Sequence, residues 1–245
     1  MKKIWVIASK DVSEAFRSRS IYLVILVAAI FAFSFGTAYN RDIGANLGAA
    51  AVTAYSRDFL STVAYIVPLM YTIIICNVFS NYTVVLDKAR RNIESLMATP
   101  VSIRQVWIGK SLSVVLPSVI LGLGMSIIVF LGFEFVLVMP NAHGFVAPAG
   151  LAIVTALVIV PVLIFGIVMV VTNLQLVISN PRIANLVFTG IFILLIVGFN
   201  LVGRFGGTTN YFPLIYLGVF AACGAISYAL AGTLTKEKVL LSSKD

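Results

Sequence analysis

The residues of this sequence that could do chemistry are concentrated in one stretch, residues 87–110, which reads DKARRNIESLMATPVSIRQVWIGK. It holds five Lys or Arg residues and two acids, and it lies between two long apolar segments. Helix-forming residues run from Asp87 to Ala98, and Pro100 marks a break because proline cannot continue the helical hydrogen-bond ladder. Two interpretations stay open here. The stretch is either a basic loop that keeps this end of the protein in the cytoplasm, or a short helix that inserts into a partner protein.

Elsewhere the sequence offers little that could catalyse a reaction. The long apolar segments contain no Asp, Glu, Lys, Arg or His, so they hold no candidate acid, base or charged metal ligand. The only histidine, His143, is expected in a solvated loop. Gly109, Lys110 and Ser111 resemble the end of a phosphate-binding loop, but Arg104 stands where that motif requires glycine. We therefore predict that the chain is not an enzyme, binds no metal and has no ATP site of its own.

The composition indicates the class of protein. The 245 residues are 60% hydrophobic and 11% charged, whereas a soluble domain has about 45–50% apolar and about 25% charged residues. We therefore expect a membrane protein whose single transmembrane domain comprises residues 1–245. A helix needs about 20 residues to cross the hydrocarbon core of a bilayer. Six segments of 19 to 26 residues contain no charged residue, and they are residues 21–39, 61–86, 111–133, 149–171, 184–202 and 213–232.

The distribution of positive charge predicts the orientation. Six crossings place both termini on the same side, and Lys and Arg are enriched in cytoplasmic loops. With the N-terminus inside, fourteen of the seventeen Lys and Arg residues lie in the cytoplasm. The net charge of +8 then lies on the inner face, where anionic lipid attracts it, and no nucleic-acid partner is expected.

The fold class that follows is all-α, a polytopic protein of the cytoplasmic membrane with six transmembrane helices and both termini inside. Residues 1–20 carry an apolar stripe at helical spacing, typical of an amphipathic helix that lies in the inner interface. The connection at residues 40–60 and the one at residues 134–148 are expected outside. An apolar extension at residues 135–139 leaves open whether the second of these dips back into the membrane.

Polar and aromatic side chains inside the predicted spans leave two readings open. Asn77 and Asn81 lie in the second span and Asn200 in the fifth. Buried amides usually bond to a neighbouring helix, and the alternative is a role in lining a pathway. Phe192 and Phe199 fall near one face of the fifth span. They fit either helix packing or an apolar wall along which a hydrophobic substrate could move.

The stretch at residues 87–110 resembles the signature of the permease subunits of type-2 ATP-binding-cassette (ABC) exporters. The layout is also similar, with an amphipathic N-terminal helix, six spans, both ends inside and a cytoplasmic coupling helix between spans two and three. The sequence departs from the family at Arg91 and Asn92, where the family usually has Gly-Thr. The matching residues are Asp87, Lys88, Arg90, Glu94, Leu96, Ala98, Thr99, Pro100, Val101, Ser102, Gly109 and Lys110.

This resemblance implies that the chain is the membrane-spanning permease subunit of an exporter and pairs with a second permease chain in a homodimer or heterodimer. The chain itself would bind no cofactor, while a separate cytoplasmic ATPase would bind ATP and Mg²⁺. The cargo is expected to be hydrophobic or amphipathic, such as a drug, lipid or peptide. The residues implied in ATPase coupling are Arg90, Arg91, Glu94, Leu96, Thr99 and Pro100. The residues implied along the translocation path are Tyr65, Met70, Asn77, Phe192, Phe199 and Asn200.

The alternative function is that of a secondary transporter or channel-like protein that works without an ATPase. Such proteins typically carry ionisable groups or broken helices near the middle of the membrane. The six predicted spans contain no charged residue, which favours the exporter. A neighbouring gene for an ABC ATPase, or co-purification with such a subunit, would discriminate between the two classes.

Overall fold

The computed structural model describes residues 29–30, 33, 36–37, 39–40, 49–90, 92, 101–178, 190, 193, 211–232 and 239. All regular structure in these residues is helical, which confirms the predicted all-α fold for this part of the chain. Within it, four helical segments are long and apolar enough to cross a membrane. They correspond to the second, third, fourth and sixth predicted spans. The first and fifth, residues 21–39 and 184–202, lie largely outside the described residues, and residues 1–20 lie entirely outside them.

The first long segment runs from α3 (Ala49–Ser80) through the π-helical turn η1 (Asn81–Val85) into α4 (Leu86–Ala89). It begins twelve residues before the predicted span, so part of the expected outer connection is helical. Three consecutive alanines open this helix, and alanine has the highest helix propensity of all residues.

The second long segment runs from α6 (Ile103–Phe133) through the π-helical turn η2 (Glu134–Val138) into α7 (Met139–Ala142). Its 40 residues are about 60 Å long at 1.5 Å per residue, twice the roughly 30 Å of a bilayer core. The apolar extension at residues 135–139 continues this helix. The segment therefore tilts in the membrane or projects beyond it.

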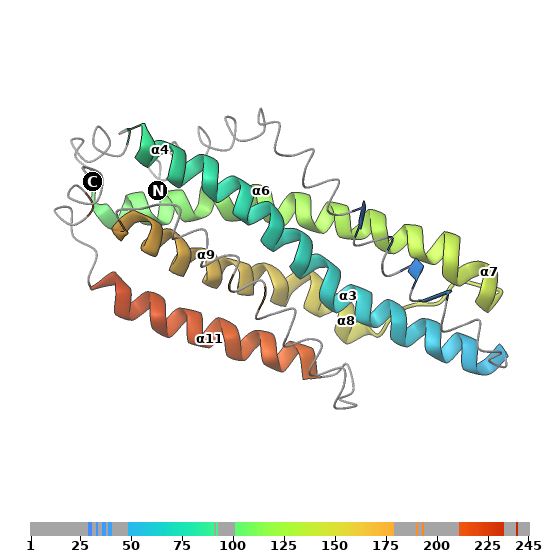
Figure 1. Cartoon of the computed structure of the whole chain (residues 1–245). Helices are drawn as coiled ribbons and strands as arrows, with labels where there is room; N and C mark the ends of the chain where they lie inside the picture. The colour runs from blue at the N-terminus through green and yellow to red at the C-terminus, as the bar shows by residue number, and fades with distance from the viewer. Residues whose placement is uncertain are drawn as a thin grey trace.

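The third segment comprises α8 (Gly150–Val154), the π-helical turn η3 (Thr155–Ile159) and α9 (Val160–Val177), and the fourth is α11 (Phe212–Ala231). Figure 1 shows the four segments side by side as an elongated bundle. α3 packs most extensively against α6, while α9 packs against both α6 and α11. α9 thus lies between α6 and α11 and links the two sides of the bundle.

The main apolar core lies where α3, α6, α9 and α11 meet, around the fully buried Leu69, Val114, Leu163 and Tyr216. α3 and α6 pack closely at Gly122, where an added Cβ would lie 2.3 Å from Oγ1 and 2.9 Å from Cα of Thr72. The two backbones can approach this closely because glycine has no side chain at the crossing.

Candidate coupling site

The charged residues of the 87–110 stretch that the structure describes lie where three helical segments end together. α4 ends at Ala89, α6 begins at Ile103 and α9 ends at Val177. Figure 1 shows these three ends at the same end of the bundle, on the left of the view. The two termini of the 87–110 stretch are therefore anchored on neighbouring helices, and α9 lies beside them.

Asp87 and Lys110 form an ion pair that joins α4 to α6, between Oδ2 of the carboxylate and Nζ of the ammonium. The side chain of Lys110 is 3% exposed and that of Asp87 is 19% exposed. Asn92 donates a hydrogen bond of 3.0 Å from Nδ2 to the other carboxylate oxygen, Oδ1. A charge removed from water is costly unless it is paired, so the ion pair explains how Lys110 can lie inside the bundle.

Lys88 joins α4 to the end of α9. Its Nζ donates hydrogen bonds to the main-chain oxygens of Gln175 at 3.3 Å and Leu176 at 3.4 Å, and to that of Ile178. The last carbonyls of a helix lack partners within it, and they lie at the negative end of the helix dipole. The C-terminus of α9 therefore compensates the charge of Lys88, which is 4% exposed. Eight residues before Lys88, Ser80 Oγ donates a bond of 2.8 Å to Gln175 Oε1.

Two contacts between neutral groups extend this junction along α6 and α9. Trp107 donates a hydrogen bond of 3.0 Å from Nε1 to the main-chain oxygen of Met169. The hydroxyls of Ser111 and Thr172 lie 2.6 Å apart. We call Asp87, Lys88 and Lys110, with the carbonyls of residues 175, 176 and 178, the junction cluster. The contacts of Trp107 and Ser111 continue this cluster toward the apolar core.

α6 begins with a capping box. The amide of Gln105 donates to Ser102 Oγ at 3.3 Å, and the amide of Ser102 donates to Gln105 Oε1 at 3.2 Å. These bonds satisfy amides that the first turn of a helix leaves without partners. With Ser102 as its N-cap, the helix starts at Ile103, eight residues before the predicted third span.

Of the residues predicted to couple to an ATPase, the structure describes Arg90. Its side chain is exposed, and its amide donates a bond of 2.9 Å to the carbonyl of Leu86 at the end of α4. An exposed guanidinium at this position is free to approach a carboxylate on another protein. The other predicted coupling residues lie outside the described residues, and they are Arg91, Glu94, Leu96, Thr99 and Pro100.

Of the predicted path residues, Tyr65 and Met70 are buried on α3. The ring of Tyr65 lies against that of Phe212 on α11, with centroids 5.3 Å apart. The carbonyl of Tyr65 accepts a bond of 2.9 Å from the hydroxyl of Tyr216. These contacts connect the second predicted span to the sixth. The other path residues, Phe192, Phe199 and Asn200, lie outside the described residues.

Asn77, the remaining path residue, pairs with Asn81 one turn later. Asn81 donates from Nδ2 to the carbonyl of Asn77 at 2.9 Å and to its Oδ1 at 3.1 Å. Both residues are half-buried. Asn81 also lines a cavity of about 340 Å³ together with Val78, Tyr82 and Leu86. The amide of Asn81, held by its bonds to Asn77, thus lies at a cavity beside η1, close to the junction cluster.

Several residues of the site were not identified from the sequence. The capping box carries a local signal, because Ser102 and Gln105 have the required spacing. The contacts of Trp107 and Ser111 with α9 carry no such signal, since their partners lie about 60 residues away along the chain.

No group of three or more His, Cys, Asp or Glu side chains that could hold a metal ion occurs in the part of the chain that the structure describes. Comparison of the sequence with models of protein families gave no match, and neither did a search of curated proteins.

Proposed function

We propose that this chain is the permease subunit of an ABC exporter, located in the cytoplasmic membrane with both termini inside. A separate ATPase subunit would bind ATP and Mg²⁺, and a second permease chain would complete the path. The cargo would be a hydrophobic or amphipathic molecule such as a drug, lipid or peptide. The observation that carries this proposal is the junction cluster, because it ties both termini of the signature-like 87–110 stretch to three membrane helices.

A coupling segment has to pass a displacement from a partner to the spans. Residues between Arg90 and Ser102 are covalently continuous with α4 on one side and α6 on the other. Lys88 adds a third connection, because its ammonium holds the C-terminus of α9. Packed helices move as rigid bodies, so a small movement of this stretch would shift all three segments together.

Six of the seven charged residues of the stretch divide into two groups with different roles. Asp87, Lys88 and Lys110 are largely buried and hold the junction cluster together. Arg90 is exposed, and Arg91 and Glu94 follow it in the sequence. The second group supplies the charges through which this chain would dock on the ATPase, where an Arg–carboxylate pair gives both strength and orientation.

The proposed cargo fits the groups near η1. Asn81, which is hydrogen-bonded to Asn77, brings its amide to a cavity whose other described walls are Val78, Tyr82 and Leu86. A site of this kind offers hydrogen bonds on one side and apolar contacts on the other. This combination suits an amphipathic molecule better than a hydrated ion, which would need several charged or carbonyl ligands.

The test is reconstitution of the full chain in liposomes with an ABC ATPase, with ATP-dependent transport and ATP hydrolysis as readouts. We would replace Arg91 and Glu94 together by Ala. The matched control replaces Arg57 and Asp58 together by Ala, because they are also one base and one acid, and they are exposed at the opposite end of α3. We expect the first double variant to lose transport and cargo-stimulated hydrolysis while its membrane insertion is unchanged, and the control to keep both activities.

Two outcomes would contradict the proposal. One is equal transport by the two double variants, which would remove the docking role of Arg91 and Glu94. The other is transport by the purified chain with no ATPase present, which would favour a secondary transporter or channel.

A further inference from the structure

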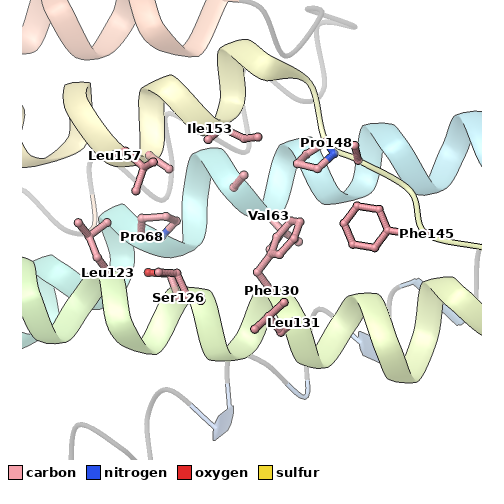
Figure 2. Close-up of a pocket in the computed structure, with 14 residues that line it drawn as sticks. Val63, Pro68, Leu123, Ser126, Phe130, Leu131, Phe145, Pro148, Ile153 and Leu157 are labelled. Atoms are coloured by element: carbon pink, nitrogen blue, oxygen red, sulfur yellow. The ribbon is translucent and has the colours of Figure 1, made fainter.

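A cavity of about 350 Å³ lies between α3, α6 and the α8–η3 segment, on the side of the bundle away from the junction cluster. Figure 2 shows Pro68 of α3, Phe130 of α6 and Ile153 of α8 around it. Its size falls in the range of sites that bind small molecules. The cavity plays no part in the proposed coupling.

The chemistry of the lining determines what the cavity can hold. Among the described lining residues Ser126 carries the only polar side chain, and its hydroxyl donates to the main-chain oxygen of Gly122. A buried water needs two to four polar partners, and apolar cavities stay dry. The lining therefore matches a hydrocarbon group and excludes a charged or strongly polar one.

The wall formed by the connection between α7 and α8 is held at two points. The amide of Val146 donates a bond of 2.8 Å to Glu134 Oε1, and the amide of Ala149 donates one of 2.9 Å to Ser61 Oγ. Between them, Ala147 and Pro148 line the cavity. Glu134 is fully buried, so its carboxylate fixes this connection from inside the bundle. The cavity is thus preformed, which lowers the cost of binding.

The rim of the cavity belongs to the exposed apolar surface of the helices. Ile127 and Leu131 on α6 and Leu157 on η3 line the cavity, and they are 53%, 42% and 51% exposed. In a protein that spans a membrane, an exposed apolar surface of this kind faces lipid tails. The cavity therefore continues the lipid-facing surface inward, and its uncharged lining complements a lipid tail.

We propose that this cavity binds one acyl chain of a bilayer lipid, with the headgroup outside it. The proposal depends on the membrane location of α3, α6 and α8–α9 and is independent of export.

The test places the photoreactive residue p-benzoylphenylalanine at Leu131 in the full chain, with Ile128 as the matched control position. Ile128 lies on the same helix, is 65% exposed and does not line the cavity. Each protein is reconstituted in liposomes of palmitoyl-oleoyl phosphatidylcholine and phosphatidylglycerol. It is then purified with a lipid-free detergent wash and irradiated, and its mass is measured by intact-mass spectrometry. We expect a one-lipid adduct that is several-fold more abundant at position 131 than at position 128.

Two variants that fill the cavity complete the experiment. Ala156→Phe narrows the η3 wall, and Ala147→Trp narrows the wall formed by the connection, where a large side chain is easier to accommodate because Ala147 is exposed. In either variant, provided that it remains monodisperse, the lipid adduct at position 131 should fall to the level at position 128. Equal adducts at the two positions in the unfilled protein would overturn the proposal. A crosslink from position 131 to a second protein chain would also overturn it.

Discussion

The contribution of the ion pair between Asp87 and Lys110 to the stability of the fold can be measured with a double-mutant cycle. The variants are Asp87→Asn, Lys110→Met and the two combined. Asp87→Asn leaves the ammonium of Lys110 without its carboxylate at a side chain that is 3% exposed. Lys110→Met leaves a carboxylate that is 19% exposed and still accepts a hydrogen bond from Asn92. The two single variants should therefore lower the free energy of unfolding by different amounts.

The magnitude follows from the burial of each partner. Removing one member of a buried pair costs about 3–5 kcal/mol of unfolding free energy, and we expect Asp87→Asn in this range. Lys110→Met should cost less, about 1–3 kcal/mol, since water and Asn92 still solvate the carboxylate. The double variant leaves no unpaired charge and should lie within about 1 kcal/mol of the native protein. The coupling energy of the pair would then be several kcal/mol.

The assay is unfolding of the purified chain in mixed detergent micelles by titration with sodium dodecyl sulfate, followed by tryptophan fluorescence. Arg104→Gln is the control, because Arg104 is exposed on the first turn of α6 and its replacement should change stability by no more than about 0.5 kcal/mol. The reasoning is refuted if Asp87→Asn costs no more than this control. It is also refuted if the double variant costs as much as the two single variants added together.

Two further predictions concern the packing of α6 and the connection after α7. Gly122→Ala should cost about 1–3 kcal/mol because its Cβ meets the backbone of Thr72 at 2.9 Å. Gly124→Ala should leave stability unchanged or raise it by up to about 1 kcal/mol, because nothing lies within 4 Å of a Cβ added there. The same micelle titration measures the stability of both variants. Equal effects of the two substitutions would contradict the close crossing of α3 and α6. Glu134→Ala should cost about 1–3 kcal/mol because the buried amide of Val146 loses its acceptor, whereas Glu134→Gln keeps an acceptor oxygen and should cost less. Hydrogen exchange should accelerate at residues 143–149 in the Ala variant, and unchanged exchange there would show that Glu134 does not hold the connection.

The sequence alone determined that the part of the chain that the structure describes is helical and suited to a membrane. Uncharged runs of about 20 residues have to be helices in lipid, because no water is present to satisfy their backbone. This reasoning identified all four spans that the structure describes. It placed their boundaries less well, and α3 begins at Ala49 instead of residue 61, while α6 begins at Ile103 instead of residue 111. Charged residues mark the ends of the lipid-embedded segment, whereas the helix itself continues beyond them to its caps.

Only the tertiary structure decided how the charges are used. The sequence singled out Asp87, Lys88 and Lys110 as parts of a motif, and it contains no information on which helix each would contact. Lys88 binds main-chain carbonyls that lie 87 to 90 residues further along the chain. Every residue has a carbonyl, so no side-chain pattern marks these partners. Similarly, no local pattern marks Glu134 as buried, because its partner is the amide of Val146. The first contact arises because α4 and α9, which are distant in sequence, end at the same level of the bundle. The second arises because the connection after α7 returns to η2.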